Sequence, residues 1–167
     1  MKRHKGRFTV LFLILLLAGT CTPAVSAPVE KVAKKERCPV CGMFVAKYQP
    51  WIAQMVFGDG QVAMFDGCKD LLAFFFEPQK YGGDKGVQTA EIWVKGYYTQ
   101  EWLDGRKALY VVGSDVYGPM GHEFIPFQSI EAARNFKKDH HGRQIVPFAE
   151  ITLEMVNARR SGQTMKE

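Results

Sequence analysis

The feature that most limits how this chain can fold is an order of predicted elements that occurs twice after residue 37. Alternating apolar residues, glycine-containing turns and short amphipathic segments predict a strand, a turn, a returning strand, a helix and a closing strand. In the first half these lie at 51–57, 58–60, 62–65, about 67–76 and 90–94. In the second half they lie at 109–112, 118–121, 124–127, 130–139 and 145–151. The repeated order indicates two copies of one unit.

The sequences of the two halves also correspond in places. A shift of 62 residues places Phe65 on Phe127, which supports a duplication. One unit of this size buries little apolar surface alone, so two units are expected to pack together. The predicted fold class is α+β, a tandem duplication of a small β-hairpin/helix/strand unit with two lobes at about 38–95 and 103–152.

The first 27 residues have the layout of an export signal. Four basic residues precede an uninterrupted apolar run at 8–18, and the segment contains no acidic residue. The run is too short to span a bilayer comfortably, so it predicts a signal peptide at 1–27, with a membrane anchor as the alternative. Residues 17–21 resemble a bacterial lipobox except for Thr20, so a membrane tether through Cys21 and ordinary cleavage are both left open. We expect a periplasmic or otherwise exported protein.

The rest of the chain is expected to divide into a polar linker, a folded domain and a tail, at 28–37, 38–157 and 158–167. The whole chain has 22 Lys and Arg against 17 Asp and Glu, a formal net charge of +5. Four of the basic residues lie in the predicted signal, so the exported part is close to neutral. It lacks the positive charge that a nucleic-acid backbone attracts, and we expect no nucleic-acid partner. Basic residues near the C-terminus, Arg159 among them, are expected to be solvated.

Export makes the cysteine count informative. Cys38, Cys41 and Cys68 follow the predicted signal, and an odd number leaves at least one thiol unpaired in an oxidising compartment. The C-x-x-C spacing of the first two brings two sulfurs within reach of one metal ion. Cys68 falls in the first turn of the predicted helix, where the helix dipole favours a thiolate. A bound metal would account for the unpaired thiol.

Two methionines add thioether donors. Met43 lies two residues after the C-x-x-C pair, beside Gly42. Met120 lies between Pro119 and Gly121 in the second turn, a poor position for core packing, and His122 follows it. Thiolate and thioether together select Cu(I) over harder ions. The candidate metal ligands are therefore Cys38, Cys41, Met43, Cys68, Met120 and His122.

Other chemistries remain open for the same residues. Zinc is the main alternative metal, because three cysteines and one histidine make a complete structural zinc set, from Cys38, Cys41, Cys68 and His122. Cys38 and Cys41 are also spaced as a redox pair or a simple disulfide.

An enzyme is the alternative from another functional class. Asp66 and Cys68 place an acid near a thiol, which would suit a lyase that cleaves carbon–mercury bonds. Asp66 is more simply the cap of the predicted helix, and the sequence contains no serine triad, phosphate-binding loop or dinucleotide fingerprint. We therefore expect a binding protein and not an enzyme.

The motifs resemble those of the NosL family in type and order. The resemblance covers roughly residues 37–151 and rests on CPVCGM at 38–43, FDGC at 65–68, GPMG at 118–121, and the segment from Phe127 to Ile151. The first half also looks like the YHS or TRASH heavy-metal modules. The family resemblance implies a tandem of small α+β units, related in fold to the organomercurial lyases.

The resemblance also implies a function. NosL proteins are Cu(I)-binding periplasmic chaperones or lipoproteins that assist the copper centres of nitrous oxide reductase. Carried over, Cys41, Met43 and Met120 are the first candidates for Cu(I), followed by Cys38 and His122, with Cys68 as a further candidate. The expected partner is then a copper-receiving assembly protein or nitrous oxide reductase itself.

Overall fold

The computed structural model describes residues 27–83 and 85–162. The predicted signal peptide and Cys21 therefore lie outside the described residues, apart from Ala27. None of the helices in the described part of the chain has the length and apolar character that crossing a bilayer requires.

The first half forms a four-stranded antiparallel sheet with the order β2-β1-β3-β4. Its strands are β1 (Ala53–Val56), β2 (Val62–Phe65), β3 (Glu91–Lys95) and β4 (Trp102–Asp104). The predicted β1–β2 hairpin closes at Gly60, whose positive φ of 84° suits a glycine. Helix α1 (Cys68–Phe76) follows β2 and packs against this sheet.

The second half forms a three-stranded antiparallel sheet with the order β8-β5-β9. Its strands are β5 (Leu109–Val112), β8 (Ile125–Phe127) and β9 (Gln144–Pro147). Between β5 and β8 the chain makes a separate hairpin of β6 (Tyr117–Gly118) and β7 (Gly121–His122). Two further helices are α2 (Ile130–Asp139) and α3 (Leu153–Arg160). Short 3-10 turns occupy Val45–Lys47, Gln49–Trp51, Pro78–Tyr81, Lys85–Gln88 and Phe148–Glu150.

Both halves share one connectivity. In each, a central strand pairs with its hairpin partner on one side, a helix follows, and the closing strand pairs on the other side. This is the order that the sequence predicts, although duplication itself stays a prediction. Strand β4 belongs to the first sheet, so the second sheet begins at β5, a few residues after the expected start of the second lobe at about 103.

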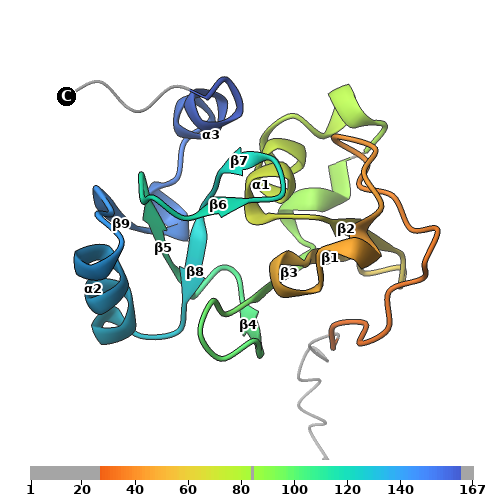
Figure 1. Cartoon of the computed structure of the whole chain (residues 1–167). Helices are drawn as coiled ribbons and strands as arrows, with labels where there is room; N and C mark the ends of the chain where they lie inside the picture. The colour runs from red at the N-terminus through yellow and green to blue at the C-terminus, as the bar shows by residue number, and fades with distance from the viewer. Residues whose placement is uncertain (1–26, 84, 163–167) are drawn as a thin grey trace, which may run out of the picture.

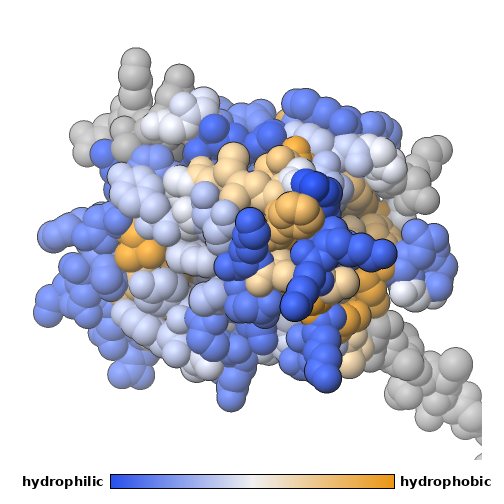
Figure 2. Space-filling view, turned by 45° about the vertical axis from the view of Figure 1, so that its right-hand side comes forward, coloured by the Kyte–Doolittle hydropathy of each residue, from blue (hydrophilic) through white to orange (hydrophobic). Residues whose placement is uncertain are grey.

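One hydrophobic core joins the two halves. Helix α1 lies between the first sheet and α3 (Figure 1), and its residues from Cys68 to Phe75 are all buried. The second sheet contributes one face to this core, through Tyr110, Val112 and Val146. Helix α2 covers the opposite face of that sheet with Ala133 and Phe136. On the face turned forward in Figure 2, an apolar area reaches the surface and is bordered by hydrophilic side chains.

Two expectations are wrong. The N-cap of α1 is Gly67 and makes no side-chain capping hydrogen bond, so Asp66 does not cap this helix. Arg159 is buried and not solvated, because α3 packs against α1 and carries Arg159 inward. Helix α3 is not predicted from the sequence, and it extends past residue 157, where the predicted tail begins.

The predicted linker is docked on the first sheet through Gln54. This buried side chain accepts a hydrogen bond from Val29 N at 2.9 Å and donates one to Val29 O at 2.8 Å. We expect Gln54→Leu to speed trypsin cleavage after Lys31 by about tenfold or more, because two hydrogen bonds of roughly 1 kcal/mol each are lost. The control is Gln49→Leu, since the Gln49 side chain bonds Ala46 O at the surface. Equal cleavage rates in the two variants would contradict this docking.

Candidate metal centre

A tight turn brings the two cysteines of the C-x-x-C segment to the same side. Cys38 N donates to Met43 O at 2.9 Å, and Gly42 N donates back to Cys38 O at 2.8 Å. Gly42 has a φ of 76°, a left-handed conformation that other residues adopt at a cost. Arg37 fastens the turn from outside, because its guanidinium donates to Gly42 O at 2.7 Å and stacks on the Phe44 ring at 3.9 Å. We call residues 38–43 the cysteine turn.

The cysteine turn faces two carboxylates at the start of α1. The Cys38 thiol donates to Asp70 Oδ2 at 3.5 Å, and the Cys41 thiol donates to Asp66 Oδ1 at 3.2 Å. One donor atom from each of these four residues lies within 4.8 Å of all the others. Three of the residues are buried and Cys41 is half-buried. The arrangement is a compact group of two sulfur and two oxygen donors, which we call the Cys2Asp2 cluster.

Burial keeps both thiols protonated when no metal is bound. It raises the pKa of Cys38 to about 12, with the Asp70 carboxylate adding to the effect. Burial also raises the pKa of Cys41, and hydrogen bonds to the two carboxylates raise it further. The pKa of Asp70 is raised as well, by burial and by the neighbouring Asp66. Asp66 Oδ2 is buried without a hydrogen-bond partner within the described chain, which leaves one oxygen of the cluster free to take a ligand.

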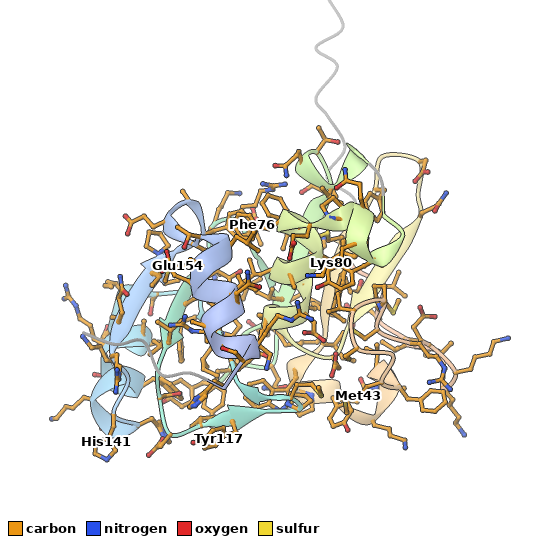
Figure 3. The ribbon with its side chains drawn as sticks, turned by 90° about the horizontal axis from the view of Figure 1, so that it is seen from above. Met43, Phe76, Lys80, Tyr117, His141 and Glu154 are labelled. Carbon is orange, nitrogen blue, oxygen red and sulfur yellow. The ribbon has the colours of Figure 1, made fainter. Side chains whose placement is uncertain are left out.

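The β6–β7 hairpin carries Met120 to the same end of α1. Met120 is 49% exposed at the hairpin tip, and its carbonyl oxygen accepts a hydrogen bond from Lys69 Nζ at 2.6 Å. Lys69 lies in the first turn of α1, directly before Asp70. Met43 and Tyr117 of β6 lie on one side of the molecule (Figure 3). The hairpin of the second half and the cysteine turn of the first therefore approach one helix end.

Cys68 and His122 are placed differently from the other candidate ligands. Cys68 is buried and outside the Cys2Asp2 cluster, with Glu123 and Tyr110 as neighbours, and burial raises its pKa well above the ordinary value. His122 is also outside the cluster, and its ring lies 4.9 Å from that of Tyr117. The structure thus brings Cys38 and Cys41 together, but it does not add Cys68 and His122 to them as the proposed zinc set requires.

The sequence reasoning missed four buried polar residues near this helix end. Asp70 belongs to the Cys2Asp2 cluster, whereas Lys69, Glu123 and Arg159 form a second polar group beside it. The four-residue spacing of Asp66 and Asp70 was an available signal, because it predicts one shared helix face. Nothing in the local sequence around Glu123 or Arg159 indicates that either is buried.

The Cys2Asp2 cluster combines soft sulfur donors with hard oxygen donors. Thiolates and thioethers favour Cu(I), whereas carboxylate oxygens favour harder divalent ions. Cys38 and Cys41 supply the two soft donors of the cluster, and the two carboxylates accept hydrogen bonds from their thiols. Met43 belongs to the cysteine turn, and the β6–β7 hairpin carries Met120 to the same end of α1. A cleft of about 400 Å³ opens beside the cysteine turn at Pro39, but no residue of the Cys2Asp2 cluster lines it. The cleft and the Cys2Asp2 cluster are therefore separate features of the surface.

Comparison with known proteins identifies a matching family and several relatives. The sequence model of the NosL family matches residues 28–156. A copper-binding lipoprotein NosL from Stutzerimonas stutzeri is 26% identical over 83% of this chain and 75% of its own length. One of the same description from Achromobacter cycloclastes is 28% identical over 92% of this chain and 84% of its own length.

A solved structure shares the fold. The crystal structure of the copper chaperone NosL from Shewanella denitrificans has a TM-score of 0.65 and 23% identity, and the match covers 79% of this chain and 99% of that one. It confirms the predicted α+β fold class. Because the family model spans most of the sequence, the chain belongs to the NosL family.

Proposed function

We propose that this protein is a periplasmic Cu(I) chaperone that assists copper-site assembly of nitrous oxide reductase, either directly or through a copper-receiving assembly partner. The observation that carries the proposal is the meeting of two free cysteines and the Met120 hairpin at one end of α1. The descriptions of the relatives as copper-binding lipoproteins and a copper chaperone support it. A membrane tether through Cys21 remains part of this proposal.

The proposed copper donors differ in solvent exposure, which suits a protein that takes up copper and passes it on. Cys38 is buried and serves as the inner donor, whereas Cys41 is half-buried and Met120 half-exposed. An incoming ligand from a partner can therefore approach the outer donors first and replace them one at a time. Cys41, Met43 and Met120 are the proposed primary ligands, with Cys38 completing the set. The protein would bind and exchange copper without turnover, so it is not an enzyme.

The two carboxylates have a separate part in this proposal. In the metal-free protein Asp66 and Asp70 accept the thiol hydrogen bonds and so orient both sulfurs toward one point. When copper binds, the thiol protons leave and the sulfurs become available as thiolates. The carboxylates also favour a structural zinc module as the second candidate, since hard oxygen donors suit a divalent ion better than Cu(I).

An anaerobic titration tests the proposed function. Apo-protein titrated with Cu(I) against a competing chelator should bind one ion tightly. Elemental analysis of protein purified anaerobically without added metal separates the two candidates. Stoichiometric zinc that Cu(I) does not displace would overturn the copper proposal.

Copper binding should also release protons. Because burial raises the pKa of Cys38 to about 12 and raises that of Cys41 too, both thiols stay protonated around neutral pH. Binding through both thiolates then releases about two protons, and the apparent affinity rises with pH by about tenfold per unit for each proton. Calorimetry in buffers of different ionisation enthalpy measures this number. A count near one would show that a single thiolate binds, and a count of zero would contradict the pKa shifts.

A further inference from the structure

A buried polar group stands directly behind the Met120 tip. Lys69 of α1 is 2% exposed, and Glu123, which follows β7, is 4% exposed. Arg159 of α3 is also buried, and its guanidinium lies 4.7 Å from the Phe124 ring centroid. The group thus joins one helix of the first half to a hairpin and a helix of the second.

Lys69 and Glu123 connect α1 to the β6–β7 hairpin through two sets of hydrogen bonds. Glu123 Oε1 accepts hydrogen bonds from Lys69 N at 2.5 Å and from Phe124 N at 2.8 Å. The Lys69 ammonium reaches back across the turn and donates to Met120 O at 2.6 Å. We call this pair the Lys69–Glu123 clasp. It holds the hairpin at Met120 and at Glu123, the residues directly before and directly after β7.

The surrounding backbone leaves room for the clasp. A side-chain carbon at Gly67 would lie only 2.2 Å from Glu123 Oε2, and one at Gly118 would lie 3.2 Å from the same oxygen. The carboxylate therefore occupies space that two glycines leave, one on each side. This fit indicates that the clasp is a specific part of the fold and not a chance contact of long side chains.

Folding alone does not explain where the Lys69 ammonium points. Burying an ammonium group is unfavourable, and Met120 O lies on an exposed tip where water could satisfy it. The hairpin has only two residues in each strand, and Tyr117 and Met120 are 60% and 49% exposed. A hairpin this small has little stability of its own, so its position depends on contacts with the rest of the protein. The clasp supplies such contacts at the residue that carries the thioether.

We propose that Lys69 and Glu123 are positioning residues that hold the Met120 thioether beside the cysteine turn, so that a donor from the second half completes a copper site begun in the first. This inference rests on the proposed copper function. It adds that the site is assembled at the start of α1. Asp66, just before the helix, and Asp70 accept hydrogen bonds from the two cysteines, and Lys69 donates one to the hairpin.

A double-mutant cycle tests the proposal. Lys69→Leu removes the bond to Met120 O without adding a sulfur atom, and we expect it to weaken Cu(I) binding by about 10–100-fold. In a Met120→Ala background the same change should have little further effect, because the clasp acts through that thioether. X-ray absorption at the copper edge should show fewer sulfur neighbours in Lys69→Leu, as in Met120→Ala.

The other outcomes are equally informative. Additive losses in the double variant, with the sulfur count of Lys69→Leu unchanged, would overturn the clasp and point to a general effect of the lysine charge on the cysteines. Lys95→Leu is the matched control, because Lys95 of β3 lies over the ring of Trp102 in β4, and it should bind copper like the parent protein. If neither Cys41→Ser nor Met120→Ala weakens Cu(I) binding, the proposed copper site fails, which is distinct from failure of the clasp alone.

Discussion

Replacing Cys41 by serine should weaken Cu(I) binding by more than about 100-fold, beyond the loss expected when only an outer partner of a metal ligand is removed. Cys41 is the half-buried thiol of the Cys2Asp2 cluster and accompanies both methionines in the proposed site. A serine hydroxyl is a hard, neutral donor and cannot replace a thiolate on Cu(I). Anaerobic competition with a chelator of known affinity measures the change.

Two further cysteine variants complete this experiment. Cys38→Ser should cause a comparable loss if the buried thiol is the inner donor. Cys68→Ala should leave the affinity within a few-fold of the parent value, because Cys68 lies outside the cluster beside Glu123 and Tyr110. A large loss in Cys68→Ala together with a small one in Cys41→Ser would mean that the ligands are assigned to the wrong cysteines.

Replacing Glu123 by alanine should lower the free energy of unfolding by about 2–6 kcal/mol, since two buried donors lose their acceptor and each costs roughly 1–3 kcal/mol. The change removes the acceptor of the Lys69 and Phe124 backbone N–H groups and leaves a cavity between two glycines. Equilibrium unfolding in denaturant measures the loss. An unchanged midpoint would contradict the buried placement of this side chain.

Glu123→Gln is the matched control. It also tests the pH dependence of stability that we expect the Glu123 carboxyl to cause. Burial raises the pKa of Glu123 from 4.5 to about 8, although the Phe124 and Lys69 N–H groups and the Lys69 charge oppose the shift. Asp70, Arg159 and Cys68 also face this carboxyl. Because the folded pKa is the higher one, stability is greatest below about 4.5, falls as the pH rises toward about 8, and then levels off. The glutamine variant should lack this decline, and parallel curves for the two proteins would refute the shift.

The elements with strong local signals could be predicted from the sequence. Helix α2 has the predicted bounds, because Ser129 caps it and its apolar residues recur at a helical spacing. The β1–β2 hairpin is marked by its glycine turn. Helix α3 could not be predicted, since only Val156 and Arg159 of its residues are buried and its position depends on distant packing against α1.

The candidate site shows where sequence reasoning stops. The C-x-x-C pair and the two methionines were identified from residue type and spacing alone. The position of Cys68 was not identified in this way. Residues two apart on a helix, such as Cys68 and Asp70, point in nearly opposite directions. Asp66 and Asp70 turn one way, toward the cysteine turn, and Cys68 turns the other way into the core. Only the packing of α1 between the two halves determines which side of the helix faces the cysteine turn and which side faces the core.

The core that both halves share around α1 has a consequence for how the two halves can be inherited. Apolar surface from the second sheet closes over the helix that carries Asp66 and Asp70 at its start, so neither half retains a complete core when separated. If two identical units were once joined, gene fission can no longer return them to independent proteins. In that case each copy would have been free to lose what the other supplied, so that the free thiols stay in the first half while the second offers Met120 at its exposed tip.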